Sequence, residues 1–391
     1  MSAACMAAPA LAEKLYDAGA SDTEIRLGMS MPFSGPAASY GTVGRVAEAY
    51  FRMVNEKGGI NGRKVTLFTY DDQYSPPKTV EVTRRMVEQD GVLAVVGTLG
   101  TAANTALLRY MNGKQVPQLF LGVGATKFND PRANPWTVPL LPSYEGEGRI
   151  YGREILKANP NAKVAVLYQN DDFGKDLLKG LKEALKAQPK AIVAEATYEV
   201  TDPTVDSQIV QLKASGADTV VILATQRAAS QAIRKAYEIG WRPQQKFVSS
   251  VSANVTTTMR PAGFDAATGM TSVNYYKDPS DARWADDPAT KQFKAFMQKY
   301  APNEDANNPN SAYGYNLSQL MTQVLRSSGD NLTRKNVLAQ ATHLKDVKLD
   351  MLLPGVALNN SPADYYPVRT LQLVRFDGKQ FEPVGAPVPD R

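Results

Sequence analysis

The stretch that decides the fold is residues 92–126, VLAVVGTLGTAANTALLRYMNGKQVPQLFLGVGAT. It has the pattern of strand, loop, helix, strand and loop, over residues 92–97, 98–100, 101–112, 118–121 and 122–126. This pattern predicts two β-to-loop junctions side by side at one edge of a parallel sheet. Ligands of open α/β sheets bind in the crevice beyond the carboxyl ends of the strands. We therefore expect these two loops to form a binding site.

Small residues and hydroxyls in the two loops fit a bound carboxylate. Gly100 and Gly124 have no Cβ, so the backbone there can approach a ligand closely. Thr101 stands where a helix N-cap belongs, and the free N–H groups that follow it would face the crevice and favour an anion. The sequence leaves one alternative open, in which Thr101 only caps its helix and the glycines only make turns.

Strands alternate with helices on both sides of this stretch. Before it, strands are expected at 24–31 and 64–70 and helices at 40–57 and 78–89. Pro139 and Pro142 break any continuing helix, and the alternation then restarts, with helices at 145–157, 172–185, 203–215 and 226–239 and strands at 163–168, 191–198, 218–223 and 246–250. Helices at 288–300, 312–327 and 333–341 follow, and then a strand at 369–376 with a hairpin turn at Asp377-Gly378. The pattern predicts an α/β protein with two sheets, each covered by helices on both faces.

Composition excludes several classes of function. The 391 residues are enough for about two domains, and 43% hydrophobic with 21% charged residues is ordinary for a globular protein. The net charge of +5 is spread along the chain, so we expect no nucleic-acid partner. With Cys5 and His343 as the single cysteine and histidine, neither an intrachain disulfide nor a Cys/His zinc site can form.

Three short motifs carry no cofactor or catalytic signal. Gly122-Val123-Gly124 begins like a dinucleotide fingerprint, but its third glycine position holds Lys127. Asp172-Phe173-Gly174 lacks the other elements of a kinase. Asp71-Asp72 precedes Pro76-Pro77 without further spaced carboxylates, which favours strand-end capping over metal binding. We therefore expect no cofactor, no metal and no enzymatic activity.

The first residues indicate export. Residues 1–12 resemble the end of a secretory signal peptide, with Ala10-Leu11-Ala12 as the cleavage site. Cys5 follows a weak lipoprotein-like box, and its lipidation stays open. No later stretch has about 18 consecutive apolar residues, so a membrane span is not expected.

Several motifs together resemble a known family. They are IRLGMSMPFSGPAASYG at 25–41, NEKGGING at 55–62, Tyr70-Asp71-Asp72, VGTLGTAAN at 96–104 and DFG at 172–174. In spacing and order they resemble the periplasmic solute-binding proteins of branched-chain amino acid ABC transporters, over nearly the whole chain from Glu24.

The resemblance implies a fold and a role. The fold would be two Rossmann-like lobes (the type I periplasmic binding protein fold) joined by three crossover strands and closing by hinge bending. The N-terminal lobe would comprise 24–143 plus 274–353, and the C-terminal lobe 144–273 plus 354–391. The protein would be a periplasmic monomer that binds a small-molecule ligand and meets the membrane only through an ABC transporter permease. A sensor that passes its closed state to a membrane receptor is an alternative.

The resemblance also implies a carboxylate site. The family's carboxylate-binding hydroxyl falls on Thr101, its second backbone-and-hydroxyl pair on Gly124 and Thr126, and a pocket aromatic on Tyr40. Hydroxyls and N–H groups of this kind can hold a carboxylate through charge-assisted hydrogen bonds.

The second lobe departs from the family pattern. Phe173 replaces a ligand-contacting tyrosine, and a second family tyrosine falls near Thr225. The family's ammonium-binding acid falls near Ser250 or Val251, where residues 247–258 (FVSSVSANVTTT) contain no carboxylate. Burying an unpaired ammonium costs several kcal/mol. We therefore expect a carboxylate with an apolar or aromatic body, between walls that include Tyr40, Leu99, Phe173 and Tyr313. A branched-chain or other hydrophobic amino acid is the alternative.

Overall fold

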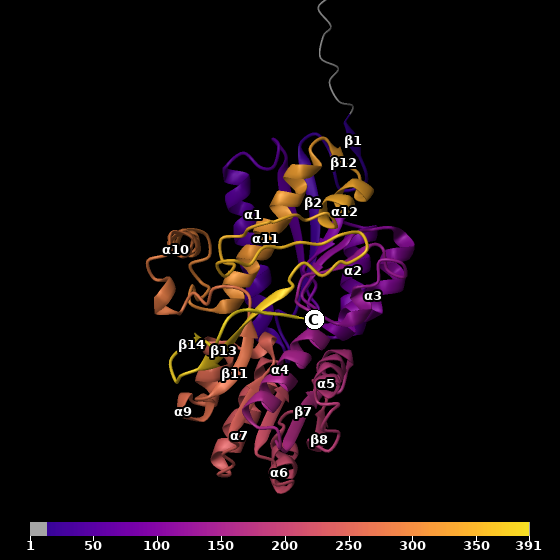
Figure 1. Ribbon diagram of the computed structural model, residues 1–391. Coiled ribbons are helices and arrows are strands. Elements are labelled where there is room, and N and C mark those ends of the chain that lie inside the picture. The colour runs from indigo at the N-terminus through magenta and orange to yellow at the C-terminus, as the bar shows by residue number, and fades with distance from the viewer. Residues whose placement is uncertain (1–13, 391) are drawn as a thin grey trace, which may run out of the picture.

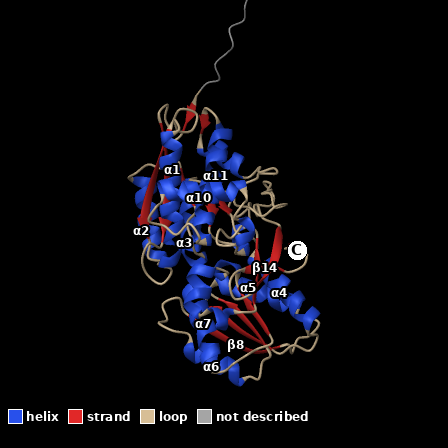
Figure 2. Cartoon of the chain, turned by 90° about the vertical axis from the view of Figure 1, so that its left-hand side faces the viewer, coloured by secondary structure: helices blue, strands red, loops and turns tan. Residues whose placement is uncertain are grey.

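The computed structural model describes residues 14–390, so the expected signal-peptide remnant and Cys5 lie outside the described residues. The described chain forms two lobes, one above the other in Figure 1, and each lobe has its own sheet. In the view turned by 90°, α1, α10 and α11 lie in one lobe and α6 and α7 in the other (Figure 2).

The N-terminal lobe contains a parallel five-stranded sheet in the order β3-β2-β4-β5-β6. Its strands are β2 (Glu24–Met31), β3 (Lys64–Asp71), β4 (Ala94–Val96), β5 (Gln118–Leu121) and β6 (Thr137–Pro139). One face packs against α1 (Thr42–Glu56) and α11 (Pro309–Ser328), and the other against α2 (Pro76–Glu88) and α3 (Thr101–Lys114). Apolar side chains at helical spacing fill both layers, as the sequence pattern predicts.

The C-terminal lobe repeats this arrangement. Its sheet has the order β14-β13-β11-β10-β9-β7-β8, with β15 paired to β13. The parallel strands are β7 (Val164–Gln169), β8 (Ile192–Tyr198), β9 (Thr219–Leu223), β10 (Gln245–Val248) and β11 (Met270–Asn274). The antiparallel strands are β13 (Thr370–Phe376), β14 (Phe381–Pro383) and β15 (Val388–Pro389), and the predicted hairpin turn joins the first two.

Helices cover both faces of this second sheet. On one face lie α4 (Tyr144–Ala158) and α5 (Asp172–Ala184), and on the other α6 (Asp206–Ala214), α7 (Gln226–Glu238) and the short α9 (Phe264–Ala267). The predicted fold class, two α/β lobes of the type I periplasmic binding protein kind, is confirmed.

The chain crosses between the lobes beside the end of β11. Tyr276 and Leu352 form an antiparallel bridge, and the Leu353 N–H donates to the Tyr275 carbonyl at 3.1 Å. The segment between them carries α10 (Pro288–Tyr300), α11, β12 (Asn331–Leu332) and α12 (Arg334–Ala341). These elements return to the N-terminal lobe, where α11 packs on α1 and β12 pairs with β1 (Leu15–Tyr16). The single histidine lies just beyond the end of α12.

The two loops that follow β4 and β5 lie side by side, as predicted. Val95 and Val96 pair with Gln118 and Leu119, and an isolated parallel bridge joins Leu99 to Gly122. The register of β5 shifts around Phe120, which has a φ of +56°. Such an irregularity redirects the strand end, and it brings Gly122 into the cleft between the lobes. No described helix is long and apolar enough to cross a membrane.

Candidate functional site

A pocket lies between the two lobes, at the carboxyl ends of β4 and β5. About 720 Å³ of space lies among its lining residues, a figure that includes open solvent. Eighteen residues line it, and none is Asp, Glu, Lys, Arg or His. Seven are aromatic: Tyr40, Tyr74, Tyr144, Phe173, Tyr275, Tyr276 and Tyr313. The walls therefore suit a ligand with an apolar or aromatic body.

Thr101 faces this pocket with a free hydroxyl. The N-cap of α3 is Gly100, with a φ of +98°, and Thr101 is the first helical residue, so its prediction as the N-cap is wrong. The Thr101 side chain is 1% exposed, and its Oγ1 has no hydrogen-bond partner among the described residues. A buried hydroxyl without a partner costs about 1–3 kcal/mol. This cost is explained if a ligand provides the missing partner.

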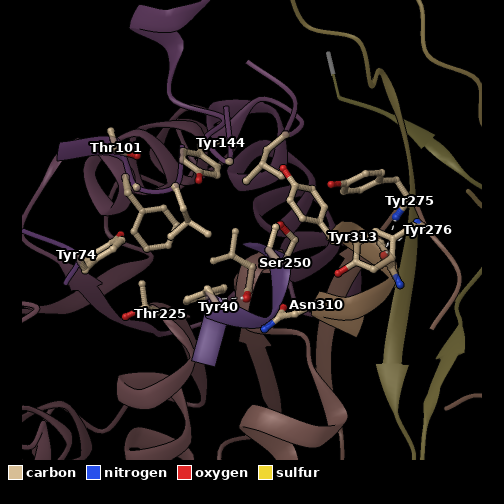
Figure 3. Close-up of a pocket in the computed structure, with 18 residues that line it drawn as sticks. Tyr40, Tyr74, Thr101, Tyr144, Thr225, Ser250, Tyr275, Tyr276, Asn310 and Tyr313 are labelled. Atoms are coloured by element: carbon tan, nitrogen blue, oxygen red, sulfur yellow. Dashed lines mark hydrogen bonds between the residues drawn. The ribbon is translucent and has the colours of Figure 1, made fainter. Parts of the chain in front are cut away.

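Two tyrosine hydroxyls in the pocket, those of Tyr275 and Tyr313, are likewise buried without a hydrogen-bond partner in the described part of the chain. Burial raises the pKa of both phenols, so each keeps its proton and can donate. Figure 3 shows Tyr275, Tyr276 and Tyr313 on one side of the pocket and Thr101 and Tyr74 on the other.

The structure brings most of the remaining predicted residues into the lining. Phe173 packs edge-to-face on Tyr144, with 5.1 Å between ring centroids. The hydroxyl of Thr225 already has a partner, because it lies 3.3 Å from the Tyr198 hydroxyl. Thr225 is therefore a weaker candidate for a polar ligand contact. The complete set of predicted residues in the lining is Tyr40, Leu99, Gly100, Thr101, Phe173, Thr225, Ser250 and Tyr313.

Gly124 and Thr126 are not brought into the pocket. A Cβ on Gly124 would lie 2.0 Å from the Pro142 carbonyl oxygen, so this glycine serves close packing on the next loop. Thr126 is exposed, and its N–H donates to Asp176 Oδ2 at 2.6 Å. Asp176 thus already accepts the hydrogen bond from the Thr126 N–H, which was expected to bind the ligand. Gly122, two residues earlier, lines the pocket in their place.

A buried carboxylate lies directly behind Ser250. Glu147, on α4, is 1% exposed. Its Oε1 accepts the Ser250 N–H at 2.8 Å, and its Oε2 accepts the Ser250 hydroxyl at 2.5 Å. Burial raises the pKa of Glu147, and the hydrogen bonds from Ser250 and Tyr151 oppose that shift. The expectation of no carboxylate near Ser250 holds for residues 247–258 but not for the folded chain.

Sequence reasoning missed the Tyr74 wall. Tyr74 has a φ of +58°, and its N–H donates to Asp72 Oδ1 at 2.9 Å. Asp72 is fully buried, and burial raises its pKa to about 6. The neighbouring Asp71 accepts the N–H groups of Phe33 and Ser34. The two aspartates therefore cap loops, as predicted, and one of them positions a pocket aromatic.

Tyr144, Tyr275 and Tyr276 were also missed. Each follows directly on a segment that was recognised, namely the Pro139–Pro142 junction or the strand ending at Asn274. An aromatic residue just past a crossover between lobes is the signal that could have identified them.

Hydrogen bonds across the cleft hold the lobes together. The Tyr40 hydroxyl donates to the Val251 carbonyl at 3.1 Å and accepts the Gln226 N–H at 3.3 Å. Asn254 Nδ2 donates to Asn308 Oδ1 at 3.0 Å. These bonds join the loops beside β2 and the start of α11 to the C-terminal lobe, so the two lobes are in direct contact across the cleft. Within residues 14–390 no cluster of three or more His, Cys, Asp or Glu side chains is placed to hold a metal ion.

Comparison with known proteins agrees with this architecture. A sequence profile described as periplasmic binding protein matches residues 24–380. The Leu/Ile/Val-binding protein homolog 1 of Brucella abortus (strain 2308) is 25% identical over 366 residues, which are 89% of this chain and 93% of that protein.

Two solved structures show the same fold. A branched chain amino acid ABC transporter protein from Thermus thermophilus with bound valine has a TM-score of 0.84 at 18% identity, covering 94% of this chain and 97% of that one. An R. palustris ABC transporter solute-binding protein in complex with benzoate has a TM-score of 0.77 at 20% identity, covering 94% and 98%.

The chain belongs to the periplasmic binding protein family, and it is similar to Leu/Ile/Val-binding protein homologues within it. Members of this family are extracytoplasmic, bind small molecules and work with ABC transporter permeases, and the family is a non-catalytic group.

Proposed function

We propose that this receptor binds a small carboxylate with an apolar or aromatic body and delivers it to the permease of an ABC importer. The observation that carries the proposal is the free, buried hydroxyl of Thr101 at the start of α3. The first N–H groups of a helix have no partners within the helix. Together with Thr101 Oγ1 they offer several donors to one carboxylate, in a field that favours negative charge.

The aromatic lining of the pocket supports an apolar or aromatic body for the ligand. Seven rings and no ionised side chain surround the space next to Thr101. Closure of the lobes would remove the ligand from water and strengthen each polar contact. The R. palustris solute-binding protein, which has the same fold, was solved in complex with benzoate, an aromatic carboxylate.

A hydrophobic α-amino acid is the second candidate, and one observation favours it. Glu147 lies one hydrogen bond behind Ser250, where it can offset part of the cost of burying an ammonium group. The Thermus thermophilus protein with bound valine has the same fold.

Calorimetry separates the two candidates. The protein is unfolded and refolded to remove any co-purified ligand and is then titrated with benzoate, 4-hydroxybenzoate, leucine and valine. We expect heat from at least one aromatic acid. Tight leucine or valine binding without aromatic-acid heat would replace the first candidate by the second. Absence of binding for all four would count against carboxylate binding itself.

A further inference from the structure

The Ser250 hydroxyl donates its single proton to Glu147 and not toward the pocket. Its Oγ lies 2.5 Å from Glu147 Oε2, and its N–H donates to Glu147 Oε1 at 2.8 Å. A serine hydroxyl has one proton to donate and two lone pairs that accept. An ionised carboxylate only accepts, so both donors of Ser250 are directed at Glu147. The Ser250 oxygen keeps its lone pairs for whatever lies in the pocket.

The surroundings hold Glu147 in this position. Tyr151, one turn further along α4, places its hydroxyl 2.8 Å from Glu147 Oε1. The same hydroxyl lies 2.8 Å from the Val248 carbonyl at the end of β10 and 3.2 Å from Ser272 Oγ in the middle of β11, so it links the carboxylate to both strands. Glu147 also lies near the N-terminus of α4, where a helix favours negative charge. The carboxylate is therefore a fixed part of the wall, beneath the surface that the ligand meets.

The other free polar atoms of the pocket behave differently. The hydroxyls of Thr101, Tyr275 and Tyr313 have no partner among the described residues, so each can donate. Ser250, which lines the same pocket, can only accept. The pocket thus offers donors at Thr101 and an acceptor, backed by a buried negative charge, at Ser250.

We propose that Ser250 is a specificity-determining residue that accepts a hydrogen bond from the ligand. The ligand would then carry a donor, a hydroxyl or an ammonium group, at the part that meets the C-terminal lobe. Glu147 acts as a positioning residue that fixes the direction of the Ser250 hydroxyl. This inference rests on the proposed carboxylate-binding function. It adds that the ligand carries a second polar group, a hydrogen-bond donor, besides its carboxylate.

Matched pairs of carboxylates test the inference by titration calorimetry. The pairs are benzoate with 3- and 4-hydroxybenzoate, benzoate with 3- and 4-aminobenzoate, and 4-methylpentanoate with leucine. We expect the donor-bearing member of at least one pair to bind about tenfold or more tightly than its parent. The 3- and 4-methoxybenzoates, which add an acceptor without a donor, should gain nothing.

Three variants connect the preference to these residues. Ser250→Ala should abolish the preference, so that the donor-bearing ligand binds no more tightly than its parent. In Glu147→Gln the side-chain amide can donate a hydrogen bond to Ser250 Oγ. The Ser250 hydroxyl proton is then free to point into the pocket and donate to a ligand, so the preference should move from donor-bearing to methoxy ligands. Such a reversal is not expected from mere loss of packing. Ser318→Ala is the control, because this buried serine donates its hydroxyl proton to the Gly314 carbonyl at 2.8 Å and does not line the pocket.

Each result has a defined meaning. Equal affinity within every pair, or a donor preference that survives Ser250→Ala, overturns the inference while carboxylate binding stands. A wild-type preference for the methoxy ligands also overturns it. If no carboxylate of any pair binds, the proposed function fails and the inference fails with it. Because Ser250→Ala keeps the Glu147 side chain and its hydrogen bond from the Ser250 N–H, it remains informative if Glu147→Gln does not fold.

Discussion

The Tyr40 hydroxyl of the N-terminal lobe donates a hydrogen bond of 3.1 Å to the Val251 carbonyl of the C-terminal lobe. The same oxygen accepts the Gln226 N–H, and the Tyr40 ring lines the pocket. One side chain therefore contributes both to the ligand wall and to closure. A ligand shifts the protein toward the closed state only by its better contacts there, and Tyr40 lowers the free energy of that state.

Tyr40→Phe should weaken ligand binding through closure. The ring stays and both hydrogen bonds of its hydroxyl across the cleft are lost, so the closed form loses about 0.5–1.5 kcal/mol or more of stability. We expect a two- to tenfold rise in Kd, and small-angle scattering should show a larger radius of gyration at subsaturating ligand. Tyr237→Phe, at an exposed position of α7, is the control. An unchanged Kd in Tyr40→Phe would mean that the contact does not contribute to closure.

Thr101→Val should weaken binding more strongly. It removes a donor from the expected carboxylate site, and hydrogen bonds to charged groups contribute about 1.5–3 kcal/mol. We expect Kd to rise about tenfold to a hundredfold, with unchanged or slightly raised thermal stability because the ligand-free hydroxyl has no partner. Thr322→Val removes another buried hydroxyl without a partner in the described chain, remote from the pocket, and should leave Kd unchanged. Similar affinities in both variants would contradict the role of Thr101.

Gly100→Ala should disturb the pocket through Tyr74. A Cβ on Gly100 would lie 2.6 Å from Tyr74 Cε2, and the φ of +98° is unfavourable for alanine. We expect lower thermal stability and weaker binding together, by about 1 kcal/mol or more each. In Gly113→Ala, on the same helix, a Cβ meets no atom within 4 Å, so this variant should be slightly stabilised. Equal melting temperatures for the two variants would argue against strain at Gly100.

Asp72→Asn should change the pH dependence of stability. Burial raises the pKa of Asp72 from 3.8 to about 6, so between these values the folded protein binds more protons than the unfolded chain. The free energy of unfolding should then fall as pH rises from about 4 to about 6, by ~3 kcal/mol from this group. The asparagine variant should lack that part of the decline, as measured by urea unfolding at several pH values.

Asp71→Asn provides the matched comparison. Burial acts to raise the pKa of Asp71, but the hydrogen bonds from Ser34, Gln73 and Phe33 outweigh it and lower the pKa. Its contribution to stability is therefore lost as pH falls, opposite in sign to that of Asp72. If both variants changed the pH profile in the same direction, this assignment of the two aspartates would be wrong.

Local pattern was enough to predict the lobes and one rim of the site. Alternation of strands and helices follows from hydrophobic periodicity, which is a property of neighbouring residues. Parallel pairing then places the loops after β4 and β5 together, which is why Leu99, Gly100 and Thr101 were found. The same reasoning could not tell the N-cap from the first helical residue, because Gly and Thr both suit that position.

The sequence by itself determined that this chain forms two α/β lobes with a polar rim built from the loop before α3. Only the tertiary structure decided what faces that rim. Glu147 reaches Ser250 across 103 positions of sequence, and Gly124 packs on Pro142 instead of a ligand. Contacts of this kind depend on how the lobes and their crossovers pack. No periodicity within a single element encodes them, because they form between elements that are far apart along the chain.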